Sequence, residues 1–415
     1  MEHLDPQKFS WMRDDAVTQL FDAFPKGSLR FVGGCVRNAL MDHEVGDIDL
    51  ATTLEPEAVI AVLKTAQVKT VPTGIAHGTV TAVSRGKPFE ITSLRQDIET
   101  DGRRAVVKFT TDWAQDAQRR DLTINALYLD IDGNIYDPTG LGLDDLHARK
   151  FRFVGEADLR IKEDYLRILR FFRFIAWYGT DPVLGDAVID AEALKACREN
   201  VKGLKSLSAE RVWSEIKKLL SAPDPSRAVR IMLTNDILDT LLPEASNSEG
   251  LDALIRLERR EAIKPDPLLR LMAMSAREPL AMALLCKRMK MSKAETARLR
   301  AWSDDGTPLD PDVDDRTKRI AIYKGGKDVV IDRARLRAAG SEDPIRSSRW
   351  MSLADLAMGW TLPDFPLTGK DLMKAGVPAG EVMGKKMAAL KALWIRSGFS
   401  VDKDKLLMAL KLLGP

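Results

Sequence analysis

The stretch that decides the fold is Gly33-Gly34-Cys35-Val36-Arg37, with Asp47-Ile48-Asp49 ten residues beyond it. The preceding Leu29-Arg30-Phe31-Val32 is short and mostly apolar, which predicts a strand. Residues 35–41 have a composition compatible with a helix. A strand, two glycines and a helix start together predict an anion cradle. Glycines let backbone N–H groups approach a phosphate, and the N-terminus of a helix adds partial positive charge.

Charged side chains complete this pattern. Arg37 is expected in the first turn of the helix, where its guanidinium reaches the same phosphates. Asp47 and Asp49 are two residues apart, so on an extended strand both carboxylates point from one face toward the same place. Two carboxylates beside a phosphate cradle repel each other unless a cation joins them, and Mg²⁺ prefers oxygen ligands. The pattern therefore predicts a metal-assisted phosphate site, although either half alone is more often a turn or a solvated loop.

Further motifs follow in a fixed order. His77-Gly78-Thr79-Val80 and the run 89–95 are strand-like, and Arg85-Gly86-Lys87-Pro88 predicts a turn between them. The next two motifs are Arg119-Arg120-Asp121-Leu122-Thr123-Ile124-Asn125-Ala126 and Glu163-Asp164-Tyr165-Leu166-Arg167-Ile168-Leu169-Arg170. Four ordered motifs are far more specific than any one of them.

In this order the motifs resemble those of the DNA polymerase β-like nucleotidyltransferases. Within that group they are most similar to the class II tRNA nucleotidyltransferases, the CCA-adding enzymes, with bacterial poly(A) polymerases as close relatives. Residues 101–113 resemble the flexible loop of the CCA-adding branch. The resemblance is strong over residues 28–180 and weak elsewhere. It implies an α+β protein whose head, a mixed sheet with helices, precedes an all-α neck, body and tail. The expected domains are 1–140 (catalytic head), 141–205 (neck), 206–345 (body) and 346–415 (tail, tRNA binding).

The resemblance also implies roles for individual residues. The family usually has Asp where this chain has Asn38, which leaves a metal-binding or arginine-orienting role at that position open. His77 is expected to be structural rather than a catalytic base. The implied metal ligands for Mg²⁺ are Asp47 and Asp49, with Glu90 as the third catalytic acid; the implied nucleotide-binding residues are Gly34, Arg37, Arg120, Asp121, Asn125, Asp164, Arg167, Arg170 and Arg173.

The spacing around Asp164 suggests how a base is chosen. Asp164, Arg167, Arg170 and Arg173 recur every three residues in a predicted helix, so neighbouring members are expected to share a face. Asp164 can accept and Arg167 can donate hydrogen bonds, which matches the amino group and adjacent ring acceptor of cytosine and adenine. Uracil and guanine present the opposite pattern, and each mismatched buried group costs roughly 1–3 kcal/mol. This pair is expected to admit CTP and ATP without a template. A surface helix with salt bridges is the alternative.

Composition limits the class of protein. The chain has 415 residues, 45% hydrophobic and 30% charged, which is typical of a soluble protein with more than one domain. No apolar run approaches the ~20 residues of a membrane span, and the N-terminus shows no targeting segment, so a cytoplasmic location is expected. Three scattered cysteines predict reduced thiols. The four histidines are not at zinc-ligand spacing.

The part after residue 140 differs from the head in pattern and charge. Residues 1–140 contain 15 basic and 21 acidic residues, whereas the remainder contains 48 basic and 40 acidic ones. The basic remainder is expected to grip RNA phosphates, although ordinary surface charge explains the excess equally well. The aromatic run 171–177 predicts a packed neck helix more than a stacking surface for bases. Ser208 predicts a capped helix start. Residues 367–380 predict two helices joined by a Gly-rich turn that, with Lys385 and Lys386, holds an RNA phosphate or is only a packing unit.

Together these features predict a template-independent enzyme that adds C, C and A to the 3′ end of tRNA and releases pyrophosphate. The expected partners are the acceptor stem and elbow of tRNA, with CTP and ATP; no membrane and no protein partner is expected. A poly(A) polymerase, an enzyme adding only CC or only A, and a non-catalytic tRNA-binding protein remain as alternatives. The retained Asp47, Asp49, Arg120 and Asp164 argue against the last.

Overall fold

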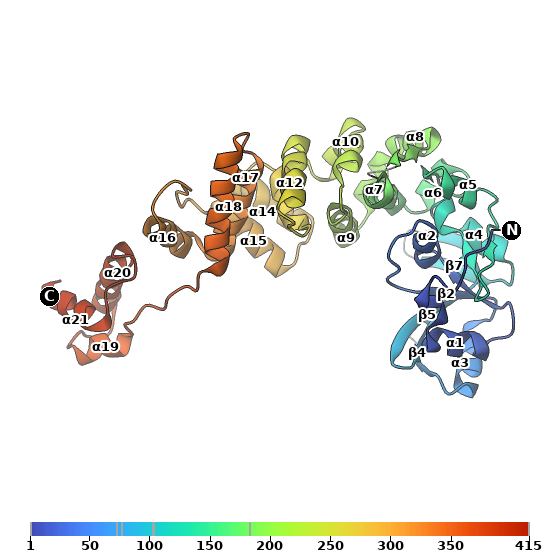
Figure 1. Ribbon diagram of the computed structural model, residues 1–415, viewed down its shortest axis with the longest axis horizontal. Helices are drawn as coiled ribbons and strands as arrows, with labels where there is room; N and C mark the ends of the chain where they lie inside the picture. The colour runs from blue at the N-terminus through green and yellow to red at the C-terminus, as the bar shows by residue number, and fades with distance from the viewer. Residues whose placement is uncertain (1, 72–73, 76–77, 102–103, 182–183, 414–415) are drawn as a thin grey trace. The chain divides into compact units, whose positions relative to one another are not determined.

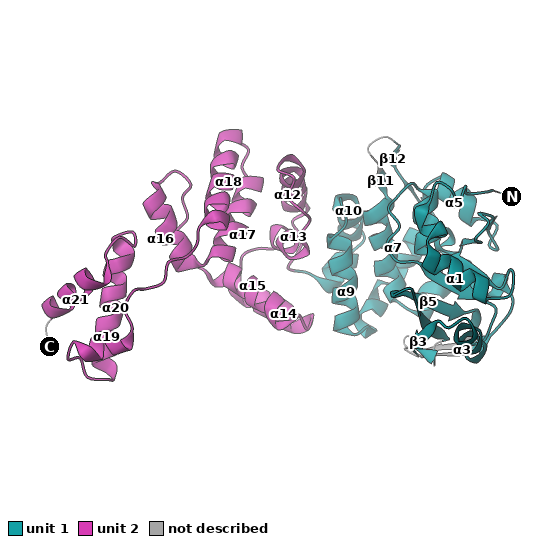
Figure 2. Ribbon diagram, turned by 60° about the horizontal axis from the view of Figure 1, so that its bottom comes forward, with its two compact units in different colours: residues 1–243 teal, residues 244–415 magenta. Residues whose placement is uncertain are grey.

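The computed structural model describes residues 2–71, 74–75, 78–101, 104–181 and 184–413. The chain divides into two compact units, residues 1–243 and residues 244–415 (Figure 2). Figure 1 follows the chain through its elements in order. Unit 1 combines a sheet with helices, and the described part of unit 2 contains helices alone. The expected α+β class is confirmed.

A seven-stranded sheet organises the first half of unit 1, in the order β3-β4-β5-β2-β1-β8-β9. Only β2 and β5 are parallel neighbours; the other pairs are antiparallel, so the sheet is mixed as expected. The strand before the glycine pair is confirmed as β1. The strands are β1 (Leu29–Val32), β2 (Asp49–Thr52), β3 (Lys69–Val71), β4 (Thr79–Ser84), β5 (Lys87–Ser93), β8 (Tyr128–Leu129) and β9 (Ile135–Tyr136).

The two faces of this sheet have different neighbours. On β1, Phe31 lies 4.8 Å from the ring of Phe21 on α1, so this face packs against the N-terminal helices. Val32 points the opposite way because side chains alternate along a strand. It joins a core with Ala51 and Tyr128. Asp49, two residues before Ala51, belongs to this second face.

Two sequence predictions in this region need correction. His77 lies outside the described residues, and the strand expected there begins at Thr79. The segment expected to be a flexible loop contains an antiparallel ribbon of β6 (Arg95–Asp101) and β7 (Arg104–Phe109), because cross-strand backbone hydrogen bonds pair most of its length. Shorter ladders join β10 (Lys150–Phe151) to β13 (Val188–Ile189), and β11 (Thr180–Asp181) to β12 (Gly185–Asp186).

The rest of unit 1 is mostly helical. Phe171, Phe172 and Phe174 of α7 are buried, while Trp177 is 39% exposed and donates its indole N–H to the carbonyl of Lys218. The aromatic run therefore packs a neck helix, as the sequence favoured. The helices are η1 (Ser10–Arg13), α1 (Asp15–Ala23), α2 (Gly34–Leu40), α3 (Pro56–Thr65), α4 (Trp113–Gln118), η3 (Thr123–Asn125), α5 (Gly142–His147), α6 (Ala157–Glu163), α7 (Leu166–Tyr178), α8 (Ala191–Glu199), η4 (Val201–Ser206), α9 (Ala209–Leu220), α10 (Ser226–Thr234) and α11 (Ile237–Leu241).

Unit 2 continues with α12 (Ser248–Arg260), α13 (Pro267–Met274), α14 (Pro279–Arg288), α15 (Lys293–Asp304), α16 (Asp315–Gly325), α17 (Lys327–Ala339), α18 (Pro344–Gly359), α19 (Gly369–Lys374), α20 (Glu381–Arg396) and α21 (Lys403–Leu412). The two helices and Gly-rich turn predicted near residue 376 are α19 and α20, with Gly376 at φ +86° between them. No helix in the described ranges is long and apolar enough to cross a membrane.

Two predicted domain boundaries cut through helices, and the one between residues 205 and 206 falls inside η4. The division between residues 345 and 346 falls inside α18, which packs against α17. The last three helices form their own core around Trp394, and Tyr323 of α16 packs against it. An irregular segment, residues 360–368, follows α18. Its two prolines, Pro363 and Pro366, were the signal for this interruption that the sequence offered.

Candidate active site

A cavity of about 620 Å³ in unit 1 is lined by Asp47, Asp49 and Glu90, and by Asp14, which pairs with Lys87. Glu90 on β5 is paired in register with Asp49 on β2, so these two side chains are neighbours on the sheet. Asp47 lies in a bend just before β2 rather than on the strand. The expectation that Asp47 and Asp49 share a strand face is therefore wrong. The bend nevertheless brings Asp47 to the same cavity as the other two acids.

The electrostatics of these acids favour a cation. Burial raises the pKa of Asp49, and the charges of Glu90 and Asp47 raise it further, while Arg120 lowers it. Among the described residues, no group of three His, Cys, Asp or Glu side chains is placed to hold a metal ion on its own. Divalent cations in nucleotide enzymes commonly complete their coordination with substrate phosphates and water. The acids therefore fit a divalent cation that binds together with a phosphate-bearing substrate.

The glycine pair lies between two guanidiniums. Gly33 has φ +72°, a conformation that favours glycine. A Cβ at Gly33 would lie 3.8 Å from Nη1 of Arg120, and one at Gly34 would lie 3.9 Å from Nη2 of Arg37. Helix α2 is only seven residues long, so its terminus contributes less than the sequence suggested. The positive charge at the glycines comes mainly from the two arginines.

Arg37 is buried, with 5% of its surface exposed. Its Nη1 donates to Asn125 Oδ1 at 2.5 Å, and its Nη2 donates to the hydroxyl of Tyr178 at 2.7 Å. Nε and Nη2 both donate to Asn38 Oδ1, at 3.2 and 2.8 Å. Of the two roles left open for Asn38, these bonds favour orientation of Arg37.

Arg120 is held by partners that the sequence did not single out. Its Nη2 donates to Asp116 at 3.0 Å and its Nε to the hydroxyl of Tyr128 at 3.2 Å. Tyr128 in turn donates to Asp116 at 2.7 Å. Burial alone would lower the pKa of Arg120, but Tyr128 and Asp116 raise it, so the guanidinium stays charged. The i, i+4 spacing of Asp116 and Arg120 was the signal available in the sequence.

Asp121 and Asn125 are brought together as expected. Asn125 donates to Asp121 Oδ1 at 3.0 Å, and Arg170 donates to Oδ2 at 2.5 Å. Burial would raise the pKa of Asp121, but the charge of Arg170 and the hydrogen bonds lower it well below its usual range. The carboxylate therefore remains ionised and anchors η3 to α7.

Asp164 and Arg167 do not share one helix face. Asp164 has extended backbone angles, φ −154° and ψ 105°, between α6 and α7. The next residue, Tyr165, packs closely on Gly203, because a Cβ added to this glycine would lie 2.1 Å from the tyrosine ring. This contact lies at the break between helices α6 and α7. Asp164 accepts from Arg211 at 2.6 Å, and Arg167 donates to Glu163 at 2.5 Å.

Two further predictions concern α7 and α9. Arg173 pairs with the buried Glu215 of α9 at 2.7 Å, so it ties the two helices together. Ser208 occupies the N-cap position of α9, as predicted, but its side chain makes no capping hydrogen bond. Arg211, on the first turn of α9, was missed as a site residue because its partner Asp164 is 47 residues away in the chain.

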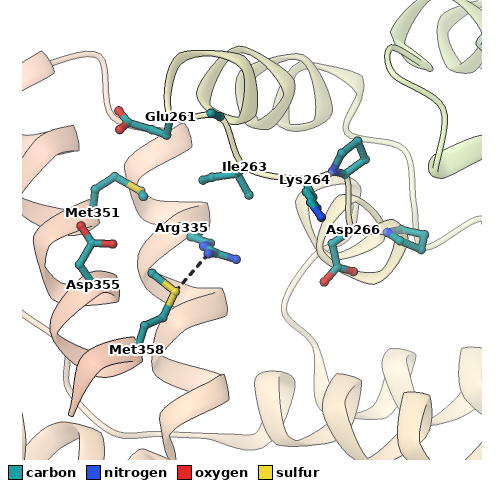
Figure 3. A pocket seen from close by; sticks show the side chains of 11 residues that line it. Glu261, Ile263, Lys264, Asp266, Arg335, Met351, Asp355 and Met358 are labelled. Atoms are coloured by element: carbon teal, nitrogen blue, oxygen red, sulfur yellow. Dashed lines mark hydrogen bonds between the residues drawn. The ribbon is translucent and has the colours of Figure 1, made fainter.

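Unit 2 holds a second cavity, of about 650 Å³ (Figure 3). Arg335 lines it and donates to the sulfur of Met358 at 3.4 Å. Two of its three acids have partners, since Asp266 pairs with Arg298 and Glu261 with Arg260; the third is Asp355. This cavity lacks the clustered carboxylates that distinguish the cavity in unit 1.

Comparison with known proteins agrees with this geometry. Residues 29–152 match the poly A polymerase head domain, and residues 188–248 match the probable RNA and SrmB-binding site of polymerase A. The chain is 33% identical over 432 residues to CCA tRNA nucleotidyltransferase 1, mitochondrial, of Danio rerio, an alignment that covers 98% of this chain and 93% of the relative. The chain belongs to the CCA tRNA nucleotidyltransferase family.

Two more members of this family are similar. A CCA-adding enzyme of Streptococcus pyogenes is 38% identical over 227 residues, which cover 54% of each chain. The crystal structure of the Bacillus stearothermophilus CCA-adding enzyme in complex with CTP superposes with a TM-score of 0.69 at 27% identity, over 98% of this nucleotidyltransferase and 97% of that chain. The family resemblance and the enzyme class expected from the sequence are confirmed.

Proposed function

We propose that this nucleotidyltransferase adds C, C and A in turn to the 3′ end of tRNA, using CTP and ATP without a nucleic-acid template and releasing pyrophosphate. The observation that carries the proposal is the cavity shared by Asp47, Asp49 and Glu90, with a glycine pair and two guanidiniums on the same head. The reaction joins the tRNA 3′-oxygen to the α-phosphorus of the nucleotide. The bond from that phosphorus to the pyrophosphate oxygen breaks.

Asp47 and Asp49 are the proposed ligands of Mg²⁺, with Glu90 as the third acid of the site. Their clustered negative charge and oxygen donors suit this hard cation. When bound, Mg²⁺ supplies activation of the 3′-hydroxyl and stabilisation of the leaving pyrophosphate. Arg37 and Arg120 are proposed to bind the triphosphate, since their guanidiniums flank Gly33 and Gly34.

Asp164 and Arg167 are proposed to read the base. Asp164 accepts one bond from the amide of Leu166 and one from Arg211. A carboxylate has about four acceptor positions and a guanidinium five donors, so both groups keep capacity for a base edge. Arg170 and Arg173 support this pair from further along α7, where they bind Asp121 and Glu215.

The RNA partner is proposed to be tRNA, gripped at its elbow and acceptor stem by the basic part of the chain after the head. In the tail, Lys385 and Lys386 follow the Gly-rich turn between α19 and α20. Lys385 pairs with an exposed glutamate, Glu381, and its side chain is 76% exposed. The compartment is proposed to be the cytoplasm, although the relative from Danio rerio carries a mitochondrial name.

Incubation of tRNA that lacks its 3′ CCA with each triphosphate and Mg²⁺ tests this proposal against its alternatives. CTP alone should add two residues, ATP should then add one, and UTP and GTP should add none. A long A tail would indicate a poly(A) polymerase, and arrest after CC or failure to begin without CC would indicate a partial enzyme. Binding of tRNA without any incorporation would indicate a non-catalytic protein.

A further inference from the structure

A chain of hydrogen bonds leaves helix α7 and returns to it. It starts at Arg170, which binds Asp121, and continues through Asn125 to Arg37. It closes at Tyr178, whose hydroxyl accepts from Nη2 of Arg37 at 2.7 Å. Arg170 and Tyr178 are eight residues apart on α7, about 12 Å along the axis. Helix α7 therefore holds Arg37 in two ways. Tyr178 binds Arg37 directly, and Arg170 reaches it through Asp121 and Asn125.

Tyr178 also fixes the geometry around Arg37. Its hydroxyl donates to Asn38 Oδ1 at 3.2 Å, the same atom that accepts from Nε and Nη2 of Arg37. Its ring lies 4.3 Å from the guanidinium carbon, with Phe174 at 5.1 Å. Asn38 donates its own amide N–H to the carbonyl of Glu44, which fixes the orientation of the amide. The guanidinium is thus held by hydroxyl, amide and aromatic groups.

Among the described residues, no carboxylate pairs with the guanidinium of Arg37. In the described part of the chain it forms no ion pair, although it is almost fully buried. Two other arginines differ, because the half-buried Arg120 pairs with Asp116 and the buried Arg270 pairs with Glu258. The nearest carboxylate in the network, Asp121, is bound to Arg170 instead. A buried cation with neutral partners is unfavourable until an anion arrives.

We propose that Tyr178 and Asn38 are positioning residues that hold Arg37 with neutral groups, so that its charge is compensated by the triphosphate of the incoming nucleotide. Since Tyr178 is part of α7, triphosphate binding is linked to this helix. Among the described residues neither Tyr178 nor Asn38 bonds to Asp164 or Arg167, so the link should be the same for CTP and ATP. This inference rests on the proposed function for the identity of the nucleotide. Its anion-binding part is independent of tRNA.

Two substitutions separate positioning from charge. Tyr178→Phe keeps the ring beside Arg37 but removes the hydroxyl. Asn38→Asp has the same shape but adds a carboxylate against the guanidinium. The matched control is Tyr136→Phe, which removes a hydroxyl that donates to Asp130 at 2.9 Å elsewhere in the head. Binding of inorganic tripolyphosphate is measured by calorimetry without tRNA, together with thermal unfolding and with kcat and KM for CTP and ATP.

Tyr178→Phe should weaken tripolyphosphate binding about tenfold and raise KM for CTP and ATP by a similar factor, with kcat and rejection of UTP little changed. Asn38→Asp should also weaken tripolyphosphate binding, yet raise the melting temperature because the buried charge gains a partner. Tyr136→Phe should match the wild type in anion binding. A purely structural role would lower stability and affinity together in both variants.

Unchanged tripolyphosphate affinity in Tyr178→Phe would overturn the positioning role. Unchanged or tighter binding in Asn38→Asp would overturn the role of the uncompensated charge. Failure of the wild type to bind tripolyphosphate would overturn the inference as a whole. If the wild type binds tripolyphosphate but adds no C or A to tRNA, the proposed function fails while the anion site stands.

Discussion

The carboxylate of Asp164 accepts a hydrogen bond from the guanidinium of Arg211 at 2.6 Å, and each side chain is 23% exposed. Asp164 lies between α6 and α7, and Arg211 is on α9. Asp164 also accepts from the backbone amide of Leu166, so both of its oxygens have partners. Both acceptor oxygens of Asp164 are therefore held in place, and Arg167 is held by Glu163 at 2.5 Å.

We expect Arg211→Ala to lower kcat/KM for CTP and ATP about tenfold and to weaken rejection of UTP, because Asp164 loses the partner that orients it. Arg211→Lys should show a smaller defect, since it keeps the charge but not the forked geometry. The exposed Arg198→Ala on α8 serves as the control. Full nucleotide selectivity in Arg211→Ala would show that Asp164 needs no external support.

Asp49→Asn should abolish incorporation of CTP and ATP together. Loss of one metal-binding charge removes several kcal/mol of transition-state stabilisation, so the rate should fall at least about a hundredfold. Binding of tRNA should change little, because the proposed RNA contacts lie outside the head. Single-turnover rates and a filter-binding assay measure the two effects. A variant that retained one nucleotide and lost the other would contradict a shared site.

The sequence predicted those parts of the molecule that depend on short-range pattern. The strand before Gly33, the turn near Gly86 and the buried aromatic run of α7 follow from local composition and periodicity. The order of the motifs was enough to indicate the family. Asp49 and Glu90 were correctly grouped, and the sheet places them in adjacent parallel strands.

Contacts between residues far apart in the chain could not be predicted from local sequence patterns. Periodicity placed Asp164 on a helix, but its extended backbone ends α6 before α7 begins, and Tyr165 packs against the distant Gly203 at this point. Asp116 and Tyr128 were missed although they hold Arg120, since an i, i+4 pair is usually a surface feature. The sequence prediction placed a boundary inside α18, although Pro363 and Pro366 mark the irregular segment that follows this helix. Partners that meet only in the folded chain carry little local information.

The tail lysines give a prediction about RNA. Lys385→Ala together with Lys386→Ala should weaken tRNA binding. The slope of the logarithm of affinity against the logarithm of salt concentration should become shallower by about one to two. The rate at saturating tRNA should be unchanged. Lys64→Ala, an exposed lysine on α3, serves as the control. If this slope is unchanged, the turn between α19 and α20 does not bind an RNA phosphate and only packs the two helices.

The cysteines give a test of the fold itself. All three are buried and free. Burial raises the pKa of Cys35 to about 11, so at pH 8 only about one thiol in a thousand is ionised. Alkylation by iodoacetamide should therefore be slow in the folded protein, rise with pH, and become fast in denaturant. Mass spectrometry of the modified peptide measures this labelling. Rapid labelling of Cys35 in the native protein would contradict its buried position at the start of α2.

We propose that one protein site, without a template, chooses C and A. The most direct measurement is the 3′-end sequence of tRNA after incubation with a mixture of all four triphosphates, for the wild type and for Asp164→Ala combined with Arg167→Ala. The wild type should end its products in CCA. The double variant should be slow and should incorporate U and G as well, because the groups that impose the mismatch penalty are gone. Products of the double variant that still end only in CCA would show that Asp164 and Arg167 do not select the base.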